Sequence, residues 1–478
     1  MGPANYDLRS GPSQSSCREK ARAEPPPATI PLPFPNPHRR PRCRAVGAME
    51  TVSRSKKCIL GEEDHISRLP EAVLGDIVIL LPTRDGGRTQ VLSSRWRLLW
   101  RSAPLNIDIH ERPLIRRIIS AGEISSILSS HLGPDRRFCI PTRYLEDDGD
   151  PTATLDGWLR SPALDGLQEL EFHYGSLRHS SGMPPLPPSA RRLWPTLCVA
   201  SFGACSFLDG DALHLPLLEQ LSLMNVGISE TSLHAFLAGC PSLQSLMLVE
   251  SIDSCSCIRI VSRTLRSIGV RTFWREDRLQ QLIIEDAPCL ERLVLLGGSS
   301  GEEMVISVVS APKLEIFGHL PAQCPRLEFG STLFQGSCVV NSAMVMPSVK
   351  VLALTHADLS LDVVIGFMKC FPCLENLYIK MKTTCNQISC HNFYVPSAFV
   401  PTKPRETNAW RRKYQNIIST LDIRLKKIAV TTYRGNKAHA NFASFFVLNA
   451  RVLQSMVLEV DVRHNNDKAW IERQHAAD

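Results

Sequence analysis

The residues in this chain that could most readily do chemistry are the cysteines and the histidine between positions 370 and 391. Cys370 and Cys373 are separated by two residues, and Cys385, Cys390 and His391 follow closely. Thiolate and imidazole groups at such spacing can bind zinc in a tetrahedral site. Cys373, however, lies in a repeated phrase, at a place where other copies carry serine or cysteine, and this favours structural cysteines. We therefore predict no metal site and no cofactor.

Sequence motifs of catalytic sites are missing from the chain. It has no nucleophile elbow, no HExxH helix and no phosphate-binding loop. The run Gly-Gly-Ser-Ser-Gly at 297–301 follows a predicted strand, but it lacks the lysine of a phosphate-binding loop and is interpreted as a flexible turn. We predict that the protein is not an enzyme.

A phrase of the form Pro-x-Leu-x-x-Leu, with apolar substitutions, recurs along the middle of the chain. Its prolines are Pro216, Pro241, Pro288, Pro312, Pro347 and Pro372. The gaps between them are 25, 47, 24, 35 and 25 residues. A gap of 47 fits two repeats, with a degenerate phrase at Leu265 and Ile268, and a gap of 35 fits one repeat with an insertion. A period near 25 with this leucine spacing indicates a leucine-rich-repeat solenoid.

The leucine spacing also predicts which side chains face outward. Each phrase is a short strand that turns its leucines inward, while the segments SETSLHAFLAGC and SLDVVIGFMKC are predicted to be helices on the convex side. Alternate strand residues should line the concave face, the usual binding surface of solenoids. These candidate target-binding residues are Gln220, Ser222, Gln244, Ser245, Met247, Arg292, Val294, Asn376 and Tyr378. The acidic residues that recur at one repeat position are interpreted as framework residues, namely Glu219, Glu291, Glu315 and Glu375.

The charge of the chain is concentrated at its beginning. Residues 1–60 contain 11 basic residues and four acidic ones, which accounts for the whole formal net charge of +7. From residue 61 onward, 43 basic residues face 43 acidic ones, so a nucleic-acid-binding domain is not expected there. No apolar run is long enough to span a bilayer and no signal peptide is present. We expect a soluble intracellular protein, in the nucleus or cytoplasm, with its 16 cysteines reduced.

The first 60 residues are rich in proline and arginine. Ten of the 34 prolines precede residue 42, and few residues there could build a core. We predict that segment 1–60 is disordered.

The segment from His65 to Asp108 contains two apolar helical patterns. The first runs from Ala72 to Leu81 and ends at Pro82. The second carries a wide apolar stripe that consists of Val91, Leu92, Trp96, Leu99 and Trp100. A stripe this wide on a short helical hairpin must pack against the following domain or bind another protein.

The sequences LP at 69–70, LLP at 80–82 and RTQVLSSRWRLLW at 88–100 resemble a plant F-box. The resemblance implies that this segment docks on a Skp-type adaptor, and through it on a cullin. The residues that would form the adaptor interface are Leu69, Pro70, Ile77, Leu80, Leu81, Val91, Leu92 and Trp96. Gly86 and Gly87 depart from the family pattern, in which alanine or valine is frequent. Each glycine inside a helix costs about 0.5–1 kcal/mol relative to alanine, so this helix should be weakened.

The end of the chain resembles a second plant module. A predicted strand through Leu425, Ile428 and Val430 is followed by a turn, a helix over 440–450 and a strand over 456–462. LKKI at 425–428, YRG at 433–435 and FFVLNARVL at 445–453 resemble the FBD segment that follows the repeats of many plant F-box proteins. Its strand, turn, helix, strand order suits a cap on the solenoid.

These patterns together predict an α/β protein in which a short all-helical F-box hairpin precedes an irregular leucine-rich-repeat solenoid with an α/β C-terminal cap. The predicted domains are a disordered tail at 1–60, the F-box at 61–105, the solenoid at 106–400 and the FBD-like segment at 401–478.

Two functions are compatible with this organisation. The resemblance implies a substrate receptor of a Skp–cullin–F-box ubiquitin ligase, which positions an unknown target protein and binds neither nucleic acid nor membrane. The alternative is a leucine-rich-repeat scaffold or ligand-binding protein in which the F-box-like hairpin serves only as an N-terminal cap. A cap would take the thermal stability of the solenoid with it when residues 61–105 are deleted, whereas a docking module would not.

Overall fold

The computed structural model describes twenty stretches of the chain. They are 66, 68–81, 83–108, 119–131, 133, 135–140, 144–145, 150–174, 183–208, 213–253, 256–271, 280–295, 305–321, 326–335, 338–341, 345–356, 361–381, 422–433, 435 and 437–460, with the single residues counted as stretches. The predictions for the tail at 1–60, for the turn at 297–301 and for Cys385, Cys390 and His391 lie outside the described residues.

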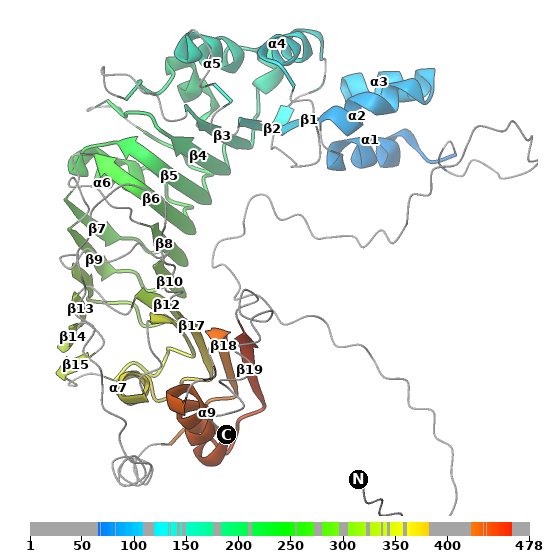
Figure 1. Cartoon of the computed structure of the whole chain (residues 1–478). Helices are drawn as coiled ribbons and strands as arrows, with labels where there is room; N and C mark the ends of the chain where they lie inside the picture. The colour runs from blue at the N-terminus through cyan, green and yellow to red at the C-terminus, as the bar shows by residue number, and fades with distance from the viewer. Residues whose placement is uncertain are drawn as a thin grey trace, which may run out of the picture. The chain divides into compact units, whose positions relative to one another are not determined.

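The repeats form a parallel sheet of 13 strands, and Figure 1 shows them following one another along the chain. The first six are β1 (Leu105–Asp108), β2 (Asp135–Ile140), β3 (Glu169–His173), β4 (Val199–Gly203), β5 (Gln220–Gly227) and β6 (Ser245–Asp253). The others are β8 (Ser267–Arg271), β10 (Arg292–Leu295), β12 (Ile316–Pro321), β16 (Val351–His356), β17 (Asn376–Met381), β18 (Lys427–Tyr433) and β19 (Ser455–Val460). A mixed α/β architecture with a parallel sheet is thus confirmed, and it is consistent with a solenoid. The degenerate phrase at Leu265 supplies β8, as the gap of 47 residues predicted.

The core follows from the alternation of side chains along each strand. Leu221, Leu246, Ile268, Leu293 and Phe317 are paired across five neighbouring strands, and all are almost fully buried. Burying each such side chain contributes about 1.5–3 kcal/mol, so one ladder of apolar residues holds consecutive coils together. The intervening residues of the same strands face away from the core.

The convex side contains strands as well as helices. The helices are α4 (Ala121–Ser130), α5 (Pro151–Leu159), α6 (Glu230–Ala238), α7 (Leu361–Cys370) and α9 (Lys437–Asn449), with 3-10 turns η2 (Pro162–Leu164) and η3 (Pro188–Leu193). The two predicted helices coincide with α6 and α7. Between them a second sheet has the order β15-β14-β13-β11-β9-β7. Its strands are β7 (Cys257–Val261), β9 (Gln281–Asp286), β11 (Val305–Val308), β13 (Arg326–Phe329), β14 (Thr332–Gln335) and β15 (Cys338–Asn341).

The second sheet has a local cause in the sequence. Ile258, Ile260, Leu282, Ile284 and Ile306 occupy alternate positions of their strands and are buried, and β-branched side chains favour strands over helices. The antiparallel strands β13, β14 and β15 occupy the insertion that the 35-residue gap predicted. The convex side of the middle coils is therefore built from strands, which the sequence patterns did not predict.

Ion pairs connect neighbouring coils just before the strands begin. Arg266 lies 2.6 Å from Glu291, Lys350 lies 2.8 Å from Glu315, and Lys426 lies 3.0 Å from Glu375. In each case a backbone hydrogen bond also joins the same two residues, from the N–H of the later residue to the carbonyl oxygen of the earlier one. Three of the four recurring glutamates therefore join the framework, as their shared repeat position indicated.

The helical segment before the sheet consists of α1 (Glu71–Leu80), α2 (Thr83–Arg88), a 3-10 turn η1 (Thr89–Val91) and α3 (Ser94–Ser102). The second apolar pattern is therefore not one continuous helix. The helical backbone is interrupted at Ser93, whose φ and ψ of −165° and 171° are extended. Ser93 is the N-cap of α3, which begins at Ser94.

Two side chains attach these helices to the first strand of the sheet. The Thr83 hydroxyl donates to the Asn106 carbonyl at 2.5 Å and accepts from the Asp108 N–H at 2.9 Å, so it occupies the edge of β1. The Asn106 amide donates to the Ile79 carbonyl at 2.5 Å, near the end of α1. The predicted domain boundary at 105/106 falls inside β1, so the helices and the sheet share a structural element.

The C-terminal unit continues the same sheet. β18 pairs with β17 and β19 pairs with β18, both in parallel, and α9 lies between them in sequence. Phe442, Phe445 and Phe446 of α9 are buried in the common core. The predicted order of strand, helix and strand is present, with β19 ending at Val460.

A glycine on the sheet gives a first test of the coil packing. A Cβ added at Gly203 would lie 1.9 Å from Cδ2 and 2.9 Å from Cβ of His173, so the ring could not simply swing away. We expect Gly203→Ala to lower the free energy of unfolding by about 1–3 kcal/mol, because the contact overpacks β3 and β4. Urea denaturation measures it. In the His173→Gly background, which removes the Cβ as well as the ring, the same substitution should cost much less, and an equal cost in both backgrounds would contradict the proposed clash.

Candidate protein-interaction surfaces

The predicted adaptor-binding residues divide into an exposed group and a buried one. Leu80, Val91 and Leu92 are 68%, 84% and 64% exposed, which is unusual for such side chains. Pro70 is also exposed, whereas Leu69, Ile77 and Leu81 are half-buried. Trp96 is only 6% exposed.

The buried side of α3 packs into the core of the chain itself. Trp96, Leu99 and Trp100 belong to the same apolar cluster as the leucines of the repeats. The Trp100 ring meets His131 edge-on at 5.1 Å, and the His131 Nε2 lies 2.7 Å from the Trp100 carbonyl oxygen. A substitution at Trp96 would therefore disturb this packing whatever else the residue contacts.

Sequence patterns missed part of the exposed apolar surface. Leu98 of α3 is 69% exposed, and Ile66 and Val73 are exposed as well. Leu98 lies two positions after Trp96 and so points to the opposite side of the helix. The helical spacing of Leu98 predicts its exposure as soon as Trp96 and Trp100 are assigned to the core. The exposed apolar surface, as the name is used below, consists of Leu80, Val91, Leu92 and Leu98.

Gly86 and Gly87 lie against the Trp100 indole. A Cβ on Gly86 would be 3.3 Å from Nε1 of Trp100, whereas a Cβ on Gly87 would be 3.8 Å from Cζ2. The first distance is tight and the second is ordinary contact. The glycine at 86 thus allows α2 to approach the tryptophan closely, which offsets its low helix propensity.

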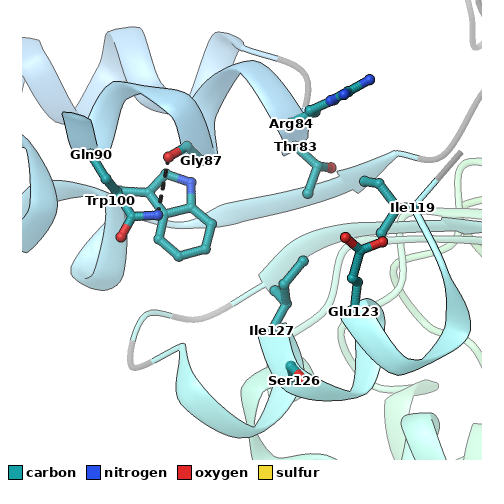
Figure 2. A pocket seen from close by; sticks show the side chains of 9 residues that line it. All are labelled: Thr83, Arg84, Gly87, Gln90, Trp100, Ile119, Glu123, Ser126 and Ile127. Carbon is teal, nitrogen blue, oxygen red and sulfur yellow. Dashed lines mark hydrogen bonds between the residues drawn. The ribbon is translucent and has the colours of Figure 1, made fainter. Parts of the chain in front are cut away.

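A pocket of about 390 Å³ separates these helices from α4 (Figure 2). Its lining residues are Thr83, Arg84, Gly87, Gln90, Trp100, Ile119, Glu123, Ser126 and Ile127. Several of its polar groups are already bonded locally. The Gln90 amide donates to the Gly87 carbonyl at 3.1 Å, the Ser126 hydroxyl donates to the Gly122 carbonyl at 2.9 Å, and Glu123 accepts from the Ser120 N–H at 2.8 Å. These groups stabilise the two walls and do not converge on a ligand.

The predicted concave-face residues lie in two rows on one face of the 13-stranded sheet. This face points away from the core and is called the outer face below; it is the face that was predicted to be concave. One row pairs Gln220 with Ser245 and continues through Arg292 to Asn376. The next row pairs Ser222 with Met247 and continues through Val294 to Tyr378. Gln244 differs, because it lies one residue before β6, at the position of the framework glutamates.

The row that contains Tyr378 is partly buried. Val294 and Tyr378 are 3% and 9% exposed, so they form the floor of the outer face, whereas Gln220, Ser245 and Arg292 are half-buried. Lys427 of β18 lies over the Tyr378 ring, with its Nζ 5.9 Å from the ring centre. Desolvation by burial raises the pKa of the Tyr378 hydroxyl.

A buried carboxyl group marks the beginning of the sheet. Asp135 is 1% exposed, and neither of its carboxyl oxygens has a hydrogen-bond partner. Burial raises the pKa of Asp135 from 3.8 to about 8. An unpaired charge at such a site is costly, so the protonated form is the stable one near neutral pH.

No group of three or more potential metal ligands occurs in the described part of the chain. Cys370 is buried and Cys373 half-buried within the repeat core. None of the described helices is long and apolar enough to cross a bilayer.

A parallel sheet with one strand per repeat, buried leucines and irregular convex segments defines the class of leucine-rich-repeat proteins. The family model of the leucine-rich repeats of FBD-associated F-box protein At5g56370 matches residues 155–379. This range runs from α5 to β17.

Curated relatives extend this match. FBD-associated F-box protein At5g44490 of Arabidopsis thaliana is 25% identical over 283 residues, which cover 56% of this chain and 58% of the relative. F-box/FBD/LRR-repeat protein At1g51370 of the same plant is 28% identical over 44% of this chain and 47% of its own length. F-box/FBD/LRR-repeat protein At1g78750 is 24% identical over 65% and 69%.

These matches show that the chain is similar to plant F-box/FBD/LRR-repeat proteins. The chain spans about 57% of the length of several of the curated relatives that it matches. The names of the three relatives above describe modules and repeats and mention no reaction.

The two glycines of α2 should respond differently to alanine. We expect Gly87→Ala to raise the free energy of unfolding by about 0.5–1 kcal/mol, because alanine has the higher helix propensity and the added Cβ makes ordinary contact. Gly86→Ala should give no such gain, because its Cβ would press on the Trp100 indole nitrogen. Urea denaturation of both variants measures the difference, and an equal gain at both positions would contradict the packing described.

Asp135 should make stability depend on pH. Because the pKa is about 8 in the folded chain and about 3.8 when exposed, the folded state holds the proton more tightly, and stability falls as pH rises from about 4 to about 8. The loss amounts to roughly 5 kcal/mol at the alkaline end. We expect Asp135→Asn to remove this fall and to raise the melting temperature at pH 8. Thermal unfolding of both proteins between pH 4.5 and 8.5 tests it, and parallel pH profiles would refute a raised pKa.

Proposed function

We propose that this protein is the substrate-receptor subunit of a Skp–cullin–F-box ubiquitin ligase. Residues 61–105 act as the F-box that docks on a Skp-type adaptor, residues 106–400 form the solenoid that holds a target protein, and residues 401–478 form an FBD-like end. The relatives named above carry F-box and repeat modules in their names, which supports this organisation. The mechanism is positioning, which raises the effective concentration of the target near the ubiquitin-charged enzyme.

One observation carries the proposal. The helices α1–α3 already bury Trp96, Leu99 and Trp100 against their own chain, and yet Leu80, Val91, Leu92 and Leu98 are each more than 60% exposed. A helical unit that needed only internal packing would have no reason to expose four large apolar side chains. Such a surface suits a second protein, and the F-box resemblance names the class of that protein.

The alternative role as an N-terminal cap also has support from the structure. α3 contributes to the common core, and Thr83 occupies the edge of β1. Deletion of residues 61–105 would therefore destabilise the sheet under either hypothesis. The two roles are compatible, and only substitutions confined to the exposed apolar surface distinguish a cap alone from a cap that also docks.

We expect Leu80→Asp and Leu92→Asp each to reduce co-purification with a Skp-type adaptor at least tenfold, because each places a charge in an apolar contact. The measurement is co-expression with the adaptor, affinity purification and quantification of the adaptor retained. The melting temperature of each variant should stay within a few degrees of the wild type, since both side chains are exposed.

Leu217→Asp is the matched control. Leu217 is 50% exposed and precedes β5, far along the chain from the helices. This variant should bind the adaptor like the wild type. Retention of the adaptor by both Leu80→Asp and Leu92→Asp would leave the cap as the sole role of the helices.

A further inference from the structure

The outer face of the 13-stranded sheet carries charges of opposite sign at its two ends. On β1 to β3 it presents Asp108, Glu169 and Glu171, with Arg137 as their shared basic partner. Arg137 lies 2.6 Å from Glu169 and 3.6 Å from Asp108, while Glu171 accepts a hydrogen bond from the Cys139 thiol at 3.0 Å. The first coils are therefore acidic on this face.

The later coils are basic on the same face. From β8 to β18 its described residues include Arg271, Arg292, Lys380 and Lys427, and no acidic residue occurs in the rows between them. The neighbouring acidic residues are the framework glutamates at the strand starts and Glu459 of β19, which is exposed and lies in the row of Lys380 beyond Thr431. Glu315 and Glu375 are paired with Lys350 and Lys426 outside the rows, whereas Glu291 is paired with Arg266 and also lies 4.0 Å from Arg292, so it offsets part of the charge of that arginine.

Lys380 and Lys427 flank an aromatic floor. Lys380 lies two positions after Tyr378 on β17 and is exposed, and Lys427 lies over the Tyr378 ring from β18. Burial, together with the charge of Lys380, lowers the pKa of His319, so the basic charge of this region comes from the lysines and not from this histidine near neutral pH. Protein interfaces combine aromatic contacts with complementary charges, so an exposed ammonium beside an aromatic ring suits a carboxylate next to apolar groups.

We propose that the outer face from β8 to β18 binds an acidic, extended segment of a target protein, with Lys380 and Lys427 pairing with its carboxylates and Tyr378 contacting its apolar side chains. This inference rests on the proposed function, because it names the chemical class of the target segment. The acidic coils β1 to β3 repel such a segment and so fix which end of the face it occupies.

An extended segment fits the dimensions of the face. Neighbouring strands lie about 4.8 Å apart, and alternate residues of an extended chain lie about 6.8 Å apart, so carboxylates at every second position fall within reach of flexible lysine side chains on successive coils. A nucleic acid would also carry negative charge. However, a phosphate backbone that followed the sheet would meet Asp108, Glu169 and Glu171, and residues 61–478 carry no net basic charge.

The test uses the full-length protein and two fluorescein-labelled 12-residue peptides of alternating charged and valine residues, one with glutamate and one with lysine. We expect the glutamate peptide to bind at least tenfold more tightly than the lysine peptide in fluorescence anisotropy at 50 mM salt, and more weakly at 500 mM salt. The double variant Lys380→Glu/Lys427→Glu should lose at least tenfold in affinity for the glutamate peptide.

The matched control is Lys313→Glu/Lys369→Glu, which changes the net charge equally at exposed positions before β12 and on α7. It should keep the wild-type preference. Equal binding of both peptides, or an equal loss in both double variants, overturns the proposal. Displacement of the glutamate peptide by a 12-mer of single-stranded DNA at lower concentration than by unlabelled peptide would make the face a nucleic-acid site and overturn it as well.

Adaptor co-purification with the same variants separates this inference from the proposed function. Lys380→Glu/Lys427→Glu should retain the adaptor fully. If the wild type binds the glutamate peptide but no adaptor, the ligase role fails while the charge preference of the face stands. If it binds the adaptor and neither peptide, the ligase role stands and the acidic-segment proposal fails.

Discussion

The parallel hydrogen-bond ladder between coils is the constraint on which the rest of this structure depends. Every strand of the 13-stranded sheet pairs in parallel with the next, and from β3 onward the backbone just before each strand is hydrogen-bonded to the coil that precedes it. Because side chains alternate along a strand, this register decides at once which residues are buried and which face outward. A slip of one residue would exchange the leucine ladder with the polar rows, at a cost of several kcal/mol for each coil.

The same ladder explains how an irregular repeat remains one structure. Convex segments differ from coil to coil, with helices in α6 and α7 and strands in β7, β9 and β11. Insertions such as β13 to β15 are accommodated because the convex side does not set the register. The ion pairs of Arg266, Lys350 and Lys426 are exposed and contribute little energy each, so they support the register without creating it. The outer face is therefore free to vary in charge without loss of the fold.

Much of this fold could be predicted because period and apolar spacing are direct consequences of the ladder. The leucines at 221, 246 and 293, the hidden phrase at Leu265 and the strand-helix-strand end all follow from local pattern. The middle convex strands could not be predicted in the same way, since short apolar runs such as Cys257–Val261 suit a strand or a helix until their partners are known. The burial of Trp96 and the exposure of Leu98 were also out of reach, because a helix with apolar residues on two sides does not reveal which side its own chain covers. The adaptor and the target are other molecules, so their contacts depend on partners that a single sequence does not contain.

The direct junction between the helices and the sheet fixes the distance between the helices and each coil of the outer face. Thr83 and Asn106 lock α1 and α2 to β1, which is itself the first strand, so no flexible linker separates the exposed apolar surface from the repeats. Each additional coil advances the outer face by about 4.8 Å along the sheet. The number of coils between β1 and a bound segment then sets the distance between that segment and the helices. A chain with one coil more or fewer before β8 would present the same segment about 5 Å farther from, or nearer to, anything held by the helices.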